Sequence, residues 1–255
     1  TDIWKIFRYN AFTLSQKNMW NYGGTPFSNN ASLRWQSMTM NRYEWDVKET
    51  FAWNWLDSRL LRGGPDVRFG SYFLTSAKFN TDKAKRMMFM LKYEGDHNFE
   101  GNRFNTISPS LTFRLGNHVY LSGQLDYAWN TDEMQYVATT SPLSSSSLAP
   151  YYYVMGHMDQ KTYGLTLKLQ VNVTPDISIQ FYGAPFTSIA KYDDFKLAAD
   201  TKSHTFENRF QRIDPDQLTY ADGVYTIGER AGQMPFRNPD FRFNEFRSNL
   251  VALWE

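Results

Sequence analysis

The chain contains no cysteine among its 255 residues. This absence excludes a disulfide framework and a thiolate metal site, and it leaves the redox compartment open. The chain also has no run of about 18 apolar residues, so no transmembrane helix is predicted. Neither sign of charge is in excess, since 27 Lys and Arg balance 26 Asp and Glu. A surface that binds nucleic acid or another polyanion is therefore not expected.

Aromatic residues, in contrast, are abundant. They make up 17% of the chain, with 20 Phe, 16 Tyr and 8 Trp. A soluble enzyme rarely needs so many, whereas a transmembrane β-barrel needs two girdles of aromatic side chains at the membrane interfaces.

The clearest pattern lies between Tyr163 and Tyr182. Apolar residues alternate with polar ones up to Val173, a turn follows at Thr174, and the alternation resumes at Ile177. Such alternation predicts a hairpin of two strands, each with one apolar and one polar face. The first strand has about 11 residues, which is the length of a tilted strand that crosses a bilayer.

The predicted connections alternate between long and short along the chain. Short turns lie at Asn41, Asn80, Gly116 and Thr174, and long loops lie near 16–30, 56–66, 96–103, 140–150 and 188–243. Long loops at one end and short turns at the other are typical of outer-membrane barrels, while a soluble β-sandwich has shorter strands and no such asymmetry. The sequence therefore predicts an all-β fold, an antiparallel transmembrane outer-membrane β-barrel of roughly ten strands over residues 1–255. Because the last predicted strand stops at Glu255, and lipid tolerates no unpaired edge, we expect further strands to complete a larger barrel.

The two faces of these strands give two sets of candidate residues. The polar set is expected to line the lumen: Arg34, Glu44, Asp46, Lys48, Arg68, Lys78, Lys92, Arg114, Gln124, Asp126, Lys168 and Gln170. The apolar set is expected to face lipid: Leu111, Phe113, Leu121, Leu165, Leu167, Leu169, Val171, Ile177 and Ile179. Since the polar set carries both signs of charge, it would hydrate a wide pore or pair into a plug in a narrow one.

Three other groups of residues could take part in catalysis or binding, but each has a plainer structural explanation. Ser122 and His118 share a predicted strand face, yet no third partner of a hydrolase triad is readable, so lumen lining is the plainer account. Asp214, Asp216 and Asp222 are a weak Ca²⁺ candidate, because their spacing does not match an EF-hand and Asp-Pro and Asp-Gly are common turn formers. The tyrosines at 151–153 are suited to stacking on sugar rings or to girdle packing. The sequence predicts no catalytic residue, no metal site and no cofactor.

Several short sequence motifs follow one another in a characteristic order along the chain. They are Leu56–Pro65, Met158–Gln160, Ala184–Phe186, Asp222–Tyr225, Asn238–Phe241, Phe246–Leu250 and Trp254–Glu255. From about Trp20 onward the chain resembles the C-terminal domain of an uncharacterised Bacteroidota family, whose members are named for a family-nine-type carbohydrate-binding domain. The resemblance implies an outer-membrane β-barrel preceded by a carbohydrate-binding-like domain that this sequence lacks. It implies no catalytic residue.

Three functions follow as expectations. The first is a non-enzymatic protein of the bacterial outer membrane that acts as a channel or surface scaffold, with a link to glycan handling through the missing N-terminal domain. The second is a subunit of a larger outer-membrane complex for transport, secretion or assembly, which docks through loop 188–243. The third is a barrel-borne hydrolase. The expected partners are outer-membrane lipid and other outer-membrane proteins.

Overall fold

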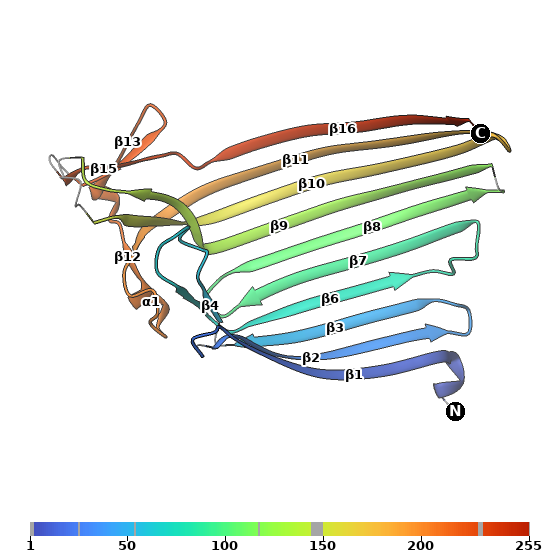
Figure 1. Cartoon of the computed structure of the whole chain (residues 1–255), viewed down its shortest axis with the longest axis horizontal. Helices are drawn as coiled ribbons and strands as arrows, with labels where there is room; N and C mark the ends of the chain where they lie inside the picture. The colour runs from blue at the N-terminus through green and yellow to red at the C-terminus, as the bar shows by residue number, and fades with distance from the viewer. Residues whose placement is uncertain are drawn as a thin grey trace.

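The computed structural model describes residues 3–24, 26–53, 55–116, 118–143, 150–228 and 232–254. Its main feature is an antiparallel sheet of eleven strands (Figure 1). A short 3-10 helix, η1 (Ile3–Ile6), precedes the sheet. The long strands are β1 (Phe7–Trp20), β2 (Pro26–Thr39), β3 (Glu44–Trp53), β6 (Tyr72–Asn80), β7 (Met87–Asn98), β8 (Arg103–Leu115), β9 (Val119–Thr140), β10 (Tyr152–Thr174), β11 (Ile177–Ala198) and β16 (Phe241–Trp254).

Each long strand pairs with the next long strand along the chain. The order is β1-β2-β3-β6-β7-β8-β9-β10-β11, and both β16 and the short strand β12 (Phe210–Arg212) pair with β11. The predicted all-β antiparallel class is confirmed. A closed barrel is not found, because within the described residues β1 and β16 are opposite edges of the sheet and do not pair with each other.

The alternating sequence explains the strand register. In the central pair of β9 and β10, Leu165 lies opposite Leu125 and Leu169 lies opposite Leu121, while Lys168 lies opposite Ser122. Directly opposed residues point to the same side of a sheet, so this register brings apolar side chains together on one face.

Several strands run further than the sequence pattern indicates. The predicted loop at 16–30 contains the end of β1 and the start of β2, and the loop at 96–103 shortens to the turn 99–102. Strand β11 continues to Ala198, well into the predicted loop 188–243. Backbone pairing continues in these places although the side chains no longer alternate. In the loop at 140–150, residues 144–149 lie outside the described residues.

The stretch from Val67 to Phe79 forms two strands rather than one. Strand β5 (Val67–Phe69) pairs with β4 (Trp55–Asp57) in a separate two-stranded sheet, and β6 begins after Gly70 and Ser71. Arg68 therefore lies outside the large sheet, which corrects its placement among the lumen-lining residues.

The rest of predicted loop 188–243 also has secondary structure. Helix α1 (Phe206–Arg209), helix η2 (Pro215–Gln217) and strands β13 (Leu218–Ala221), β14 (Val224–Ile227) and β15 (Met234–Arg237) follow β11, and β13–β15 form a sheet. Together with β4, β5 and the ends of β9–β11 they form what we call the cap, at the end of the large sheet that carries the long connections (Figure 1). Two hydrophobic clusters stabilise it, one around Met134 and Met155 and one around Val154 and Phe195.

None of the helices in the described ranges is long and apolar enough to cross a membrane.

Candidate functional site

One face of the large sheet collects almost all of the predicted lumen-lining residues. The register places Arg34 opposite Lys48, Asp46 opposite Lys78, and Lys78 opposite Lys92. On the other side of the sheet's centre, Gln124, Asp126, Lys168, Gln170 and Arg114 share this face through their partners on β8, β9 and β10. We call it the polar face. It contains every residue of the predicted polar set except Arg68.

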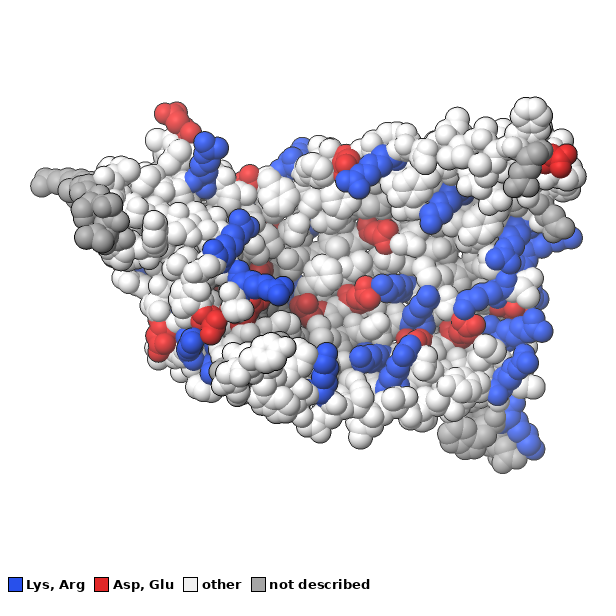
Figure 2. All heavy atoms as spheres, viewed as in Figure 1, with Lys and Arg blue, Asp and Glu red and all other residues white. Residues whose placement is uncertain are grey.

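Charges of opposite sign lie side by side on the polar face (Figure 2). Arg34 Nε donates to Asp46 Oδ1 at 2.8 Å, and Lys92 Nζ lies 2.7 Å from Glu94 Oε2. Asp126 Oδ1 accepts hydrogen bonds from Ser108 and Gln124 at 2.6 and 2.8 Å. Such pairing lowers the cost of holding many charges on one surface, and the surface remains suited to contact with water.

The opposite face, which we call the apolar face, holds all nine residues of the predicted apolar set. Large hydrophobic side chains on it are exposed, and Leu121, Leu167 and Ile179 are 43%, 39% and 39% exposed. A contiguous exposed apolar surface of this kind marks contact with a partner or with lipid.

Aromatic rings on the apolar face form two bands. Near the short turns, Phe79 contacts Trp45 and Tyr43, with ring centroids 4.4 and 6.0 Å apart. Near the cap, Phe51 contacts Phe73 at 5.0 Å, and further along the sheet Tyr127 contacts Tyr163, also at 5.0 Å. On β3 the two bands are six residues apart, which is roughly 20 Å along a strand.

The short-turn end of the sheet carries exposed basic residues. Basic side chains gather along the right edge of Figure 2. The exposed basic residues at this end include Arg42, Lys83, Lys85, Arg86 and Arg114. The overall charge balance of the chain gives no sign of this concentration, because it arises only when the short turns lie side by side.

The cap buries charged groups that sequence reasoning missed. Arg209 is 0% exposed, and its guanidinium donates to both carboxylate oxygens of Glu100 and to the backbone oxygen of Arg68. Lys196, 1% exposed, lies 3.5 Å from Asp194 and 3.8 Å from Glu133. The residues lie in predicted loops or on strand ends without alternation, and no sequence signal links them.

Two titratable groups in the cap have shifted pKa values. Burial lowers the pKa of His157, but Glu133 Oε1, 3.0 Å from Nδ1, and the carboxylates of Asp193 and Asp159 together outweigh burial, so the pKa is raised. Burial raises the pKa of the Asp132 carboxyl, and the nearby Glu133 and Asp96 raise it further, while the backbone N–H of Met134 opposes the shift.

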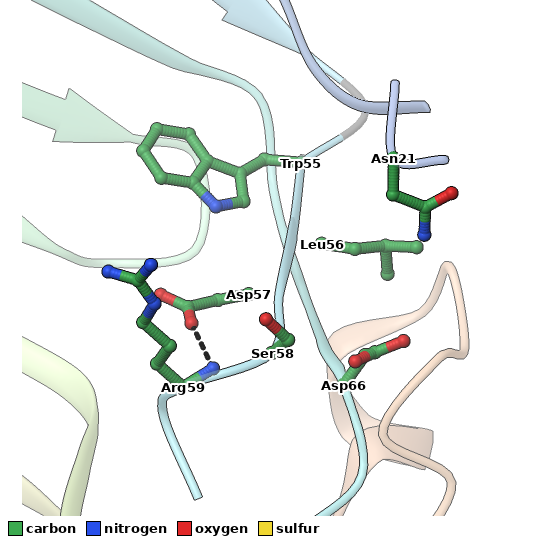
Figure 3. Close-up of a pocket in the computed structure, with 7 residues that line it drawn as sticks. All are labelled: Asn21, Trp55, Leu56, Asp57, Ser58, Arg59 and Asp66. Atoms are coloured by element: carbon green, nitrogen blue, oxygen red, sulfur yellow. Dashed lines mark hydrogen bonds between the residues drawn. The ribbon is translucent and has the colours of Figure 1, made fainter. Parts of the chain in front are cut away.

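A pocket of about 430 Å³ opens where the cap meets the sheet (Figure 3). Trp55, Asn21, Asp57, Arg59 and Asp66 are among its lining residues. Trp55 also lines a second pocket of about 300 Å³, together with Phe69, Tyr72 and Asp96. The first pocket's carboxylates already have partners.

Asp57 accepts the backbone N–H of Arg59 at 2.6 Å, and Asp66 lies 3.2 Å from Lys202 Nζ. Both carboxylates therefore make contacts within the protein.

The remaining sequence candidates are not brought together. His118 and Ser122 are four residues apart along an extended chain, roughly 13 Å, so they do not form a catalytic dyad. Asp214 precedes η2, Asp216 lies in it, and Asp222 forms the β13–β14 turn with positive φ. In the described part of the chain no three His, Asp or Glu residues form a group that could hold a metal. Tyr152 and Tyr153 pack on the cap clusters, while Tyr151 is exposed.

Comparison with known proteins gives one match. A family model described as Domain of unknown function (DUF5916) matches residues 3–221. No curated protein and no solved structure matches the chain.

Proposed function

Since the chain belongs to the DUF5916 family, whose function is unknown, we propose from its geometry that it forms part of the wall of an outer-membrane β-barrel. In this proposal the apolar face contacts lipid, and the polar face lines an aqueous interior. The protein acts as a channel or surface scaffold and is not an enzyme.

The observation that carries the proposal is the separation of side chains between the two faces of one sheet. On β10, the side chains of Leu165, Leu167 and Leu169 share the apolar face, while those of Lys168 and Gln170 lie on the polar face.

 In a soluble protein the leucine side would be buried in a core. Here it is exposed and flanked by two bands of aromatic rings, as expected at the two interfaces of a membrane.

The open edges of the sheet also bear on the proposal. Strands β1 and β16 each have one side without a strand partner among the described residues. An unpaired strand edge is costly in lipid, because each free N–H and C=O group lacks water to bond with. We therefore propose that further strands, from the same polypeptide or from another chain, pair with both edges to close the barrel.

Membrane insertion can be tested with single cysteines, because the natural chain has none to interfere. We would place one cysteine at a time at positions 165–170 of β10 and reconstitute each variant in vesicles. The expected result is alternation. Even-numbered positions should react with a water-soluble thiol reagent, and a probe at odd-numbered positions should be quenched by lipid-borne spin labels. Uniform reaction at all six positions would contradict the proposal.

The channel version needs a separate measurement. Conductance in planar bilayers should rise in discrete steps after insertion, and neutralising Lys168 and Lys78 on the polar face should reduce anion selectivity. If the cysteine test shows insertion but no conductance appears, the scaffold version remains.

A second candidate is a non-enzymatic subunit of a larger outer-membrane complex. The ordered cap favours it, because the segment after β11 forms its own sheet and packs on Val154 and Phe195. A folded platform of this kind presents a fixed surface to a partner. Co-purification from native membranes of wild type, but not of a variant lacking residues 214–237, would support this candidate.

The proposed location and the proposed link to glycans depend only on the resemblance to the Bacteroidota family described above. We propose the outer membrane of a Bacteroidota bacterium, with glycan handling supplied by a neighbouring carbohydrate-binding-like domain. Binding of glycans by the full-length protein, but not by this segment, is the expected result.

A further inference from the structure

Four basic residues lie together on the apolar face, next to the cap. They are Arg103 on β8, Lys161 on β10, Lys191 on β11 and Arg242 on β16. All four side chains are exposed. Four basic side chains are unusual on a largely apolar face, although polar residues such as Thr131 and Asp159 also lie near the cap.

The strand register brings these residues close to one another. Lys161 lies opposite Ile189, and Ile189 lies opposite Arg242 on the next strand. Neighbouring strands are about 4.8 Å apart, so Lys161 and Arg242 are separated by roughly 10 Å at the backbone. Lys191 is two residues beyond Ile189, and Arg103 lies opposite Thr131, which is two residues beyond Trp129. Long, flexible side chains can therefore converge over one patch, which we call the basic patch.

The basic patch lies at the level of the aromatic band near the cap. Lys161 is directly opposite Trp129, and Trp129 stacks on Tyr127 with a centroid distance of 5.2 Å. Trp and Tyr side chains favour the headgroup level of a membrane. If the apolar face contacts lipid as proposed above, the basic patch is held at the headgroups of the leaflet on the cap side.

The charges of the basic patch are not neutralised within the protein. In the described part of the chain no carboxylate is within 4.0 Å of the cationic atoms of these four residues. Asp159 is the nearest acid by register, since it lies opposite Lys191. Its Oδ1 accepts the hydroxyl of Thr131 at 2.8 Å, and its Oδ2 is 3.6 Å from His157 Nε2.

We infer that the basic patch binds the phosphate groups of a membrane lipid in the leaflet next to the cap. Phosphate oxygens accept charge-assisted hydrogen bonds from Arg and Lys, and several cations around one site match the multiple negative charges of a phosphorylated glycolipid. The acyl chains of such a lipid would lie along the neighbouring apolar side chains, such as Tyr163 and Leu165. This inference rests on the proposed function, because it needs the apolar face to contact lipid.

The test compares two variants with four substitutions each. The first neutralises the basic patch: Arg103→Gln, Lys161→Gln, Lys191→Gln and Arg242→Gln. The matched control neutralises four exposed bases at the short-turn end: Arg8→Gln, Arg42→Gln, Lys85→Gln and Arg86→Gln. Both change the net charge by the same amount at exposed positions, and circular dichroism of the purified proteins checks that each one is folded.

The measurement is a titration of purified protein in neutral detergent with lipopolysaccharide, with the same lipid after phosphatase treatment, and with inorganic phosphate. Wild type and control should bind intact lipopolysaccharide alike, and the patch variant should bind it at least roughly tenfold more weakly. The dephosphorylated lipid should bind all three proteins weakly, and inorganic phosphate should not displace the intact lipid at equal concentration.

Three results would overturn the inference. They are equal binding by the patch variant and wild type, an equal loss in both variants, and displacement by inorganic phosphate. Insertion into vesicles, followed by flotation and protease protection, is measured in parallel. Insertion without selective lipid binding removes this inference alone, whereas a failure of all three proteins to insert also removes the proposed function.

Discussion

The guanidinium of Arg209 is fully buried against the carboxylate of Glu100, a residue 109 positions earlier in the chain. The pair joins α1 in the cap to the turn between β7 and β8. A buried charge that loses its partner is costly, while a buried pair replaced by neutral groups of similar size costs little. Substitutions at Arg209 and Glu100 therefore test how much this pair stabilises the packing of the cap on the sheet.

Replacing Arg209 alone should destabilise the cap severely. Arg209→Met leaves Glu100 unpaired at a site where its side chain is only 14% exposed, and we expect a loss of about 3–5 kcal/mol in the free energy of unfolding. This loss in the free energy of unfolding is measured by the protease sensitivity of residues 199–240 as a function of urea concentration. The double variant with Glu100→Gln should recover most of the loss. As a control, Arg212→Ala removes the exposed ion pair with Asp194. It should lower the free energy of unfolding by no more than about 1 kcal/mol.

Gly70 should tolerate no side chain. A Cβ at this position would lie 2.5 Å from Glu100 Cδ and 2.7 Å from Oε1, and the carboxylate is fixed by Arg209. We expect Gly70→Ala to displace Glu100 and lower cap stability by roughly the amount of a broken buried pair. Gly23→Ala is the matched control, because its nearest neighbour is the flexible end of Asn21 at 3.3 Å. Equal melting temperatures for the two variants would contradict the prediction.

The stability of the cap should depend on pH through His157. The pKa of His157 is raised in the folded protein, so protonated His157 stabilises the fold. This contribution is complete below the unfolded pKa of about 6.5 and is lost as the pH rises through the folded value. We therefore expect the cap to melt at a lower temperature at pH 8.5 than at pH 6, and His157→Gln should reduce that difference.

Ionisation of Asp132 should also lower the stability of the cap as the pH rises. The pKa of its carboxyl is raised, so the ionised form opposes folding, and this cost grows as the pH rises from the unfolded pKa of about 3.9 through the folded value. Asp132→Asn removes the cost, and we expect the variant to be more stable than wild type at neutral pH. The amide accepts the Met134 N–H as the carboxylate does, and this keeps the local backbone intact. A less stable variant would contradict the prediction.

Insertion energetics should differ between the two faces of one strand. Leu167→Arg places a charge on the apolar face between the two aromatic bands, where we expect a cost of about 2–4 kcal/mol in folding into lipid vesicles. Gln170→Arg places the same charge on the polar face of the same strand and should cost close to nothing. Urea-dependent folding into vesicles measures both. Equal costs would indicate that the two faces meet the same surroundings.

The sequence predicted the large sheet well where side chains alternate. The hairpin of β10 and β11 follows the pattern from Tyr163 to Tyr182, and its turn lies after Thr174 as predicted. The alternation exists because the two faces have different surroundings, so it is readable only while that difference lasts. Beyond Phe186 the side chains of β11 lose the pattern. Its backbone nevertheless continues to pair with β10 as far as Leu197, and the prediction of a loop was wrong there.

The division of the candidate residues between the two faces was predictable from the same alternation. Residues such as Lys168 and Leu169 take opposite faces through strand geometry alone. The pair of Arg209 and Glu100, and the contacts of Lys196, depend on the path of the chain through the cap, which no local pattern encodes. Arg68 was misplaced because the break at Gly70 and Ser71 sends β5 into a different sheet.

Strands β9, β10 and β11 belong to both the large sheet and the cap, and β10 runs for 23 residues from one end to the other. Because a single hydrogen-bonded ladder crosses from one part to the other, neither part has a boundary at which it can separate. Heating should therefore melt them in one cooperative transition, and a ligand captured at the cap would raise the melting temperature of the whole sheet.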